Sequence, residues 1–467
     1  MNTTAVINYL YDFDAKTCDI HLRYHNTIAT TNKTYIDKYQ SWIDSKSLAS
    51  PPELLITSYA PLHKGEPLQE VSRHCRHEVL VIQGLITFFI GAPLTVYDNI
   101  GGISEKVISD EVNLELFEKV RPTVFKYDNT DYSEDVDHTI DAISQDSDLI
   151  CSLLDSWRKA LYLQEESADA NLFHDECILR LMHIFELISG QFHKELKEKL
   201  SLKCTQLVEN FYEILYYKNP KEIAIKSNAL LKEVLVSKEL TFSNKIKYCL
   251  DKYGLLDECL DSFIDSMISI RNGIAHGRIV YRQDLIWPLP PFFGLTHESY
   301  DIIPIIITLT AQIIGCYIGI SRWNREWEDT KSFLLVPERR LLEFINNPKE
   351  KVTKEQLLQL SNNTVTWFSI FSHHVQSPKK FALDVIADIF GTYLIDTELT
   401  EENAVQLYDI SILFSECSIL PIKEKAVENV RTIIKERYDT RWNSLRDIYP
   451  YLQACGISSR SFSLFFE

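Results

Sequence analysis

The sequence predicts a mainly α-helical protein with an α+β segment at its N-terminal end. Of its 467 residues, 45% are hydrophobic and 11% aromatic, while glycine and proline number only 14 and 16. This composition is typical of a compact, helix-rich chain long enough for two to four domains. From about residue 149 onwards apolar residues recur at helical spacing, whereas the first 125 residues contain short alternating stretches. Both patterns together predict the fold class.

The N-terminal segment reads as strands and one long helix. Runs of alternating or clustered apolar residues predict strands at 5–11, 18–24, 54–59 and 94–97. The first two strands should form a hairpin. A helix is expected from about Gln69 to Ile90, ending at Gly91. Residues 129–148 are rich in Asp, Ser and Thr with little periodicity, which marks them as a linker. We therefore expect an α+β domain over 1–128, with a sensing or regulatory role.

The helical remainder is expected to form a central bundle over 145–325 and an all-helical C-terminal domain over 326–467. Apolar stripes predict helices at 149–161, 177–188, 207–217, 223–235, 244–249, 338–345, 354–359, 365–371, 381–395, 403–416 and 423–437. The segment from Ile302 to Ile320 has no charged residue and just reaches the length of a membrane span. Its polar residues and the absence of a second span favour a buried helix over a membrane anchor.

Charge and cysteine usage exclude several classes of function. A formal net charge of -18 argues against a general nucleic-acid binder, although a local basic cleft remains compatible with it. The ten cysteines contain no C-x-x-C pair, so neither a disulfide scaffold nor a zinc ribbon is predicted. Free thiols and the lack of a signal peptide are typical of a cytoplasmic protein. No phosphate-binding glycine loop is present, and we expect no cofactor.

Two histidine-containing runs invite a metal interpretation, which the spacing does not favour. His74 and His77 flank Cys75, and His373 is followed by His374. Neither run has further ligands at the right spacing within its own element, and two close histidines do not complete a tetrahedral site. We therefore predict no metal site.

The seven residues from Arg271 to Gly277 (RNGIAHG) are the most informative stretch of the chain. They close an amphipathic helix expected from Leu256 to Ile274, whose apolar residues recur at intervals of three, four and seven. Arg271 lies four residues after Met267, within the apolar stripe, where a guanidinium needs a partner or a wet, functional interface. The glycines at 273 and 277 permit the backbone to leave helix geometry beside the histidine.

The run R-N-G-I-A-H resembles the R-x4-H signature of HEPN domains, in which an Asn often follows the Arg directly. The members that it resembles are metal-independent ribonucleases built as helical bundles, many of which act in bacterial defence or as toxins, the ApeA-like group included. The resemblance covers about residues 145–325. It implies a HEPN-like bundle, RNA as the partner, and a homodimer formed through bundle helices.

The residue types fit such chemistry. RNA can be cut without a metal because its own 2′-hydroxyl is the nucleophile. His276 suits proton transfer because imidazole titrates near neutrality. Arg271 would hold the scissile phosphate, Asn272 would fix the histidine tautomer or bind a phosphate oxygen, and Arg278 and Arg282 would bind substrate. The alternative is a helix end at which the Arg and His only cap carbonyls and favour the helix dipole.

An acidic residue on an earlier helix completes the expected site. HEPN-like families often carry one near the R-x4-H pair, and the resemblance points to Glu186, with Glu176 as the alternative. Glu186 would orient His276 or neutralise Arg271. Because it lies in a polar strip with a three-residue repeat, an ordinary solvent-exposed strip is the competing interpretation.

The spacing of the motif favours a dimer. In an unbroken helix, Arg271 and His276 are five positions apart and point about 140° from each other. They reach one phosphate either when two chains each supply one of them across a two-fold axis, or when the helix breaks at Gly273.

We therefore expect a three-part cytoplasmic protein whose central domain is a metal-independent endoribonuclease, with tRNA as a candidate target. The resemblance alone points to antiviral defence or toxin-mediated growth arrest. A non-catalytic HEPN-like scaffold or ligand-binding module is the alternative.

Overall fold

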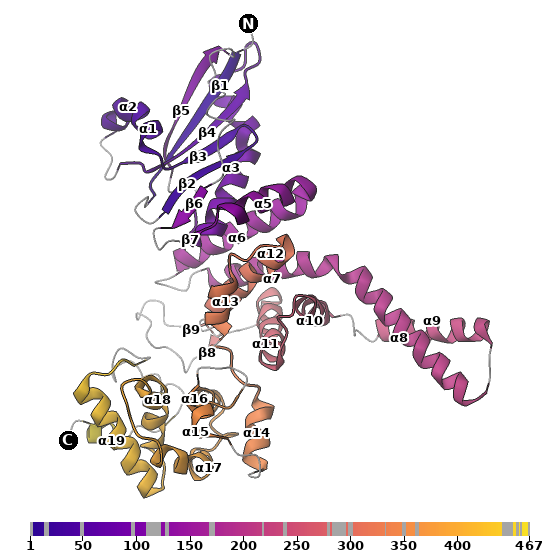
Figure 1. The fold of residues 1–467 in the computed structure, drawn as a ribbon, viewed down its shortest axis with the longest axis vertical. Coiled ribbons are helices and arrows are strands. Elements are labelled where there is room, and N and C mark those ends of the chain that lie inside the picture. The colour runs from indigo at the N-terminus through magenta and orange to yellow at the C-terminus, as the bar shows by residue number, and fades with distance from the viewer. Residues whose placement is uncertain are drawn as a thin grey trace. The chain divides into compact units, whose positions relative to one another are not determined.

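The protein is mainly α-helical with an α+β N-terminal region, as predicted (Figure 1). The computed structural model describes residues 3–13, 18–46, 51–94, 99–108, 123–126, 130–167, 173–216, 219–236, 241–277, 281–282, 296–297, 302–331, 333–347, 352–359, 364–440, 452–453, 457 and 460–465. Two compact units result, the first containing 1–232 and 306–325, the second 233–305 and 326–467. The expected bundle over 145–325 is therefore shared between both units, and the three-domain division stays a prediction.

The N-terminal strands form one antiparallel sheet in the order β5-β1-β4-β3-β2-β6-β7. The strands are β1 (Thr3–Tyr11), β2 (Cys18–Tyr24), β3 (Thr27–Thr30), β4 (Leu54–Pro61), β5 (Asn99–Ile108), β6 (Thr123–Lys126) and β7 (Thr130–Asp131). The expected β1–β2 hairpin is wrong, because β1 pairs with β4 and β5 and lies inside the sheet. The strand predicted at 94–97 falls outside the described residues except for Leu94, which lies in no strand.

Helix α3 (Leu68–Ile90) covers one face of this sheet, as Figure 1 shows. It ends where predicted, because Gly91 has a φ of 81° and donates its backbone N–H to Thr87. Such a left-handed cap is favourable only for a residue without a side chain. Across the interface, Gln83 Nε2 donates to the Tyr11 hydroxyl at 2.9 Å, so a buried polar pair is satisfied. The short helices α1 (Lys33–Ile36) and α2 (Gln40–Ser45), joined by a 3-10 turn, pack on Leu10 and Leu55.

Three consecutive helices and α12 complete the packed part of the first unit. These are α5 (Ser133–Gln145), α6 (Ser147–Ser167), α7 (His174–Gln191) and α12 (Ile303–Ile318), of which α12 belongs to this unit from residue 306. The linker prediction at 129–148 is wrong, since α5 occupies most of it. Val136, Thr139 and Ile143 form the buried face of α5. Because Thr139 is polar, the sequence does not show the repeat of apolar residues that would predict a helix here. The buried hydroxyl of Thr139 donates a hydrogen bond to the backbone carbonyl of Asp135 at 2.7 Å.

The apolar segment at 302–320 forms a buried helix, as expected. Ile306, Leu309, Ile313 and Ile314 of α12 are fully or almost fully buried. Among the described residues, no helix is both long and apolar enough to cross a membrane. Following α7, α8 (His193–Ile214) and α9 (Pro220–Val236) form an arm with little buried surface.

The described part of the second unit is almost entirely helical. Its helices are α10 (Phe242–Lys252), α11 (Glu258–Ala275), most of α13 (Asn324–Lys331), α14 (Glu338–Asn346), α15 (Lys354–Leu357), α16 (Trp367–Gln376), α17 (Leu383–Ile395), α18 (Ala404–Phe414) and α19 (Leu420–Glu436). A two-stranded sheet, β8 (Tyr281–Arg282) and β9 (Thr296–His297), and a 3-10 helix (Phe462–Phe465) are also described. The six helices predicted after residue 326 are confirmed, with their ends moved by a few residues.

Candidate functional site

The N-terminal end of α11 is held firmly by charged partners. The Asp257 carboxylate caps the helix by accepting from the Leu260 backbone N–H at 2.8 Å. One residue on, Glu258 receives two hydrogen bonds from Arg340 of α14, at 2.8 and 3.2 Å. The pKa of Glu258 is lowered, first by the hydrogen bond from Arg340. Acidic residues at this end also complement the helix dipole, so the helix that carries the motif starts from a fixed point.

Helix α10 is fixed against α11 by one lysine and two aspartates. Lys247 Nζ lies 2.9 Å from Asp261 and 2.8 Å from Asp265, and the Ser243 hydroxyl donates to Asp265 at 2.8 Å. Burial alone would lower the pKa of Lys247, but the hydrogen bonds and charges of the two aspartates outweigh it and raise that pKa. This network ties α10, whose first turn contains Phe242, to the first half of α11.

Arg271 is half-buried on the packed side of α11, in line with the buried Ile264 and Met267. Its guanidinium carbon lies 5.5 Å from the centre of the Phe242 ring, a cation–π contact, and its Nη1 donates to Asn272 Oδ1 at 3.2 Å. No carboxylate among the described residues pairs with it. The guanidinium is thus oriented by an aromatic ring and an amide while its charge is not neutralised within that part of the chain.

His276 occupies the C-terminal cap of α11 and is solvent-exposed. Its backbone N–H donates to Asn272 O at 3.1 Å, which continues the helical hydrogen-bond pattern past Gly273. The chain leaves the helix only at Gly277, with a φ of 63°. Of the two routes to a shared phosphate, the break at Gly273 is therefore wrong, since that glycine is buried inside an intact helix. Arg271 and His276 remain about 140° apart around the axis.

Those of the remaining predicted site residues that the structure describes belong to elements other than α11. Glu186 lies on α7 in the first unit, is exposed, and has its carboxylate 3.9 Å from His183 Nδ1. The strip to which it belongs is solvent-facing, and its role beside the motif stays a prediction, as does that of the exposed Glu176. Arg278 lies outside the described residues. The backbone of Arg282 belongs to β8, opposite Thr296, and its side chain is not described.

Sequence reasoning missed Phe242. It stands at the start of α10, far from the motif in sequence, and only the packing of α10 on α11 brings its ring to Arg271. A phenylalanine at a half-buried helical position is normally an ordinary packing residue, so no local signal distinguishes it.

The histidine runs have structural explanations. His373 Nε2 and His374 Nδ1 each donate to a backbone carbonyl, of Val336 and Phe381 respectively, both at 2.6 Å. Burial lowers the pKa of both imidazoles, which keeps them neutral. His74 instead lies 2.7 Å from Glu66. Within the described part of the chain, no three His, Cys, Asp or Glu residues gather as a metal site would require.

None of the protein-family models, curated proteins and solved structures compared with this chain matches it. Any function must therefore be argued from the motif and its geometry.

Proposed function

We propose that this chain is a metal-independent endoribonuclease that cleaves RNA through its own 2′-hydroxyl. The observation that carries the proposal is Arg271, a half-buried guanidinium oriented by Phe242 and Asn272 with no carboxylate partner among the described residues. A cation fixed in this way is unfavourable unless it serves an anion, and the planar guanidinium matches a phosphate. The exposed His276 lies five positions further on, at the same helix end.

In the proposed reaction, Arg271 binds the non-bridging oxygens of the scissile phosphate and stabilises the negative charge of the transition state. A neutral His276 accepts the proton of the 2′-hydroxyl, whose oxygen attacks the phosphorus. The bond from phosphorus to the 5′-oxygen breaks, and that oxygen receives a proton from a protonated imidazole or from water. The products are a 2′,3′-cyclic phosphate and a 5′-hydroxyl. Asn272 aligns the guanidinium and can bind a phosphate oxygen.

The resemblance to HEPN ribonucleases supports the same reaction and adds a setting. The enzyme would work in the cytoplasm as a homodimer, in antiviral defence or toxin-mediated growth arrest, with tRNA as a candidate target. The parts of the chain outside the motif region would sense a trigger, select the RNA or hold the enzyme inactive. A net charge of -18 would suppress indiscriminate RNA binding and leave recognition to a local cationic site.

The test compares Arg271→Ala and His276→Ala with wild type on defined RNA and total tRNA. Each substitution should lower the cleavage rate by about 10²- to 10⁴-fold, as expected for loss of an acid–base group or phosphate ligand. The matched controls are Arg76→Ala and His63→Ala, an exposed arginine and an exposed histidine outside the motif. Circular dichroism and thermal unfolding should be unchanged in all four variants. Cleavage that survives both motif substitutions would contradict the proposal.

A non-catalytic binding module is the second candidate. The observation that favours it is that Arg271 and His276 do not face one direction within one chain. Such a module would bind RNA through Arg271 and never cut it, and His276→Ala would leave that affinity unchanged. Binding and cleavage measured on the same samples separate the two candidates.

A further inference from the structure

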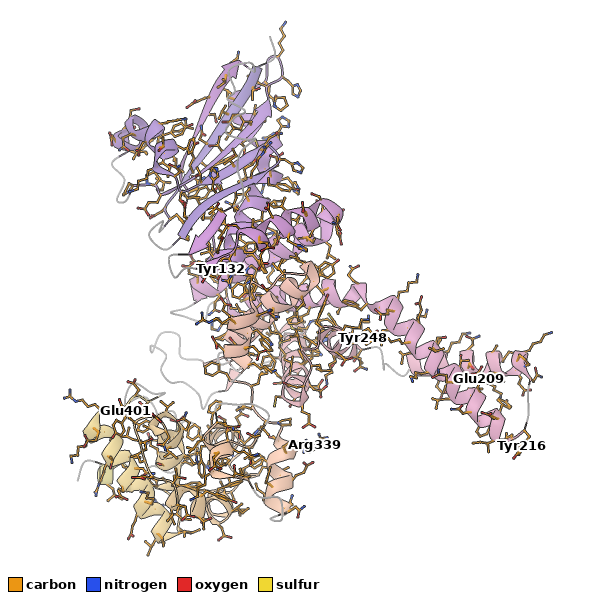
Figure 2. The ribbon with its side chains drawn as sticks, viewed as in Figure 1. Tyr132, Glu209, Tyr216, Tyr248, Arg339 and Glu401 are labelled. Carbon is orange, nitrogen blue, oxygen red and sulfur yellow. The ribbon has the colours of Figure 1, made fainter. Side chains whose placement is uncertain are left out.

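Helix α10 runs antiparallel to the motif helix α11, so its first turn reaches the arginine of the motif. Lys247, in the second half of α10, contacts Asp261 near the start of α11, whereas Phe242 at the start of α10 contacts Arg271 near the end of α11. Figures 1 and 2 show the two helices side by side, with Tyr248 labelled on α10. The motif therefore has a neighbour from a separate helix.

The first turn of α10 is fixed on both sides of Phe242. Before it, the Thr241 hydroxyl caps the helix by accepting from the Asn244 backbone N–H at 3.3 Å. After it, the Ser243 hydroxyl donates to Asp265 of α11 at 2.8 Å. A capped turn that is also tied to the neighbouring helix leaves the ring of Phe242 few alternative positions.

The two described contacts of the Arg271 guanidinium are uncharged. A carboxylate partner would neutralise the guanidinium and compete with a phosphate for its N–H donors. The ring of Phe242, 5.5 Å away, attracts the cation without neutralising it, and Asn272 accepts from one N–H at 3.2 Å as a neutral amide. The contacts therefore hold the guanidinium in place and leave its charge available to an anion.

We propose that Phe242 is a positioning residue for phosphate binding, and that the ion network of Lys247 makes α10 the element that holds it there. The inference rests on the proposed role of Arg271 as the phosphate ligand, and it adds a requirement for a helix outside the motif. An arginine that is oriented beforehand loses less freedom when phosphate binds. Immobilising one flexible side chain on binding would otherwise weaken the affinity by about 2- to 12-fold.

The first experiment measures binding of a fluorescent 2′-O-methyl oligoribonucleotide by anisotropy. This probe cannot be cut, because its 2′-oxygen is blocked. Phe242→Leu keeps an apolar side chain but removes the ring, and it should weaken binding by about 2- to 12-fold, whereas Phe242→Tyr keeps the ring and should bind like wild type. Phe333→Leu is the matched control, at a phenylalanine that is 52% exposed, and should change nothing. Equal affinities of Phe242→Leu and wild type would overturn the proposal.

A double-mutant cycle separates positioning from a structural role. If the ring acts through the guanidinium, Phe242→Leu should have no further effect on binding in an Arg271→Ala background. A ring that only supports the local fold would weaken binding by the same factor in both backgrounds, and that result would contradict the proposal. Circular dichroism should show the same helix content in all of these variants.

The aspartates of α11 test the part played by α10, because two effects then have opposite signs. Removing two negative charges near a phosphate site should by itself tighten RNA binding. If the network of Lys247 holds Phe242 in place, Asp261→Ala/Asp265→Ala should instead weaken binding by about 2-fold or more. The control is Asp251→Ala, which removes an exposed carboxylate of α10 outside the network. Tighter or unchanged binding by the double variant would refute the role of the network.

Binding to an uncleavable probe also separates this inference from the proposed reaction. A wild type that binds the probe with the expected pattern of variants, but cuts no RNA, would defeat the endoribonuclease and support the positioning role. A wild type that cuts RNA, beside a Phe242→Leu variant with unchanged affinity and kcat/KM, would defeat the positioning role alone. Absence of binding by wild type would overturn the positioning role together with the role of Arg271.

Discussion

If Arg271 and His276 act on one phosphate, the intact helix α11 requires that they come from different chains. The two side chains are about 140° apart around a helix that continues through Gly273. In a two-fold dimer, each composite site then uses the arginine of one protomer and the histidine of its partner. Mixing two inactive variants, Arg271→Ala and His276→Ala, should therefore restore cleavage, because a mixed dimer contains one complete site.

The expected activity follows from counting sites. With equal amounts of the two variants and free exchange, half of the dimers are mixed, and each mixed dimer has one complete site out of two. The mixture should thus recover about a quarter of the activity of the same total amount of wild type. If every chain carried a complete site of its own, the mixture would stay inactive.

The assay uses chains with two different affinity tags, dissociated in mild denaturant, recombined and tested on a fluorescent RNA. Copurification of both tags confirms that exchange has occurred. A second mixture provides the control, since adding an equal amount of the double variant Arg271→Ala/His276→Ala to wild type should halve the activity through inactive mixed dimers. Exchange without recovered cleavage, or full activity of a monomeric wild type at nanomolar concentration, would refute the composite site.

Three further predictions concern chemistry and stability. Cleavage should persist in excess EDTA and leave 2′,3′-cyclic phosphate ends. A 2′-deoxy residue at the cleavage site should block the reaction. Loss of cleavage on chelation, with activity restored by added magnesium, would point to a metal mechanism instead. Burial lowers the pKa of His373 and His374, so below about pH 6.5 the unfolded chain should bind protons at these residues before the folded chain does. The free energy of unfolding should therefore fall as the pH falls. In urea titrations, a His373→Gln/His374→Gln variant should show a weaker pH dependence of that free energy. The ring of Trp157 is fully buried and packs on Phe88 and Trp323, with 6.1 and 5.6 Å between ring centres. Trp157→Ala should therefore lower the free energy of unfolding by about 3–5 kcal/mol. A loss below about 1 kcal/mol would contradict that packing.

The sequence by itself determined most of the helices and several of the strands, because these elements are encoded by local periodicity. The helix from Leu68 to Ile90 shows this, since its apolar pattern and the glycine at 91 define both its extent and its end. The motif was also visible from sequence alone, because its residue types and spacing are contiguous. A local pattern failed where a polar residue took a buried position, as Thr139 does in α5.

Only the tertiary structure decided which elements meet. The partner strands of β1 come from positions 54–61 and 99–108, and strand neighbours of this kind depend on long-range pairing that no adjacent residue encodes. The same holds for Phe242, which reaches Arg271 only because Lys247 and its two aspartates fix α10 against α11. Whether Gly273 breaks the helix was open from sequence, since glycine tolerates both states, and the packing of α11 decided for an intact helix. Leu207, Phe211 and Ile214 on one face of α8 are exposed although their spacing is that of a buried helix face. Apolar spacing in a sequence indicates which face of a helix can be buried, but not which element packs against that face.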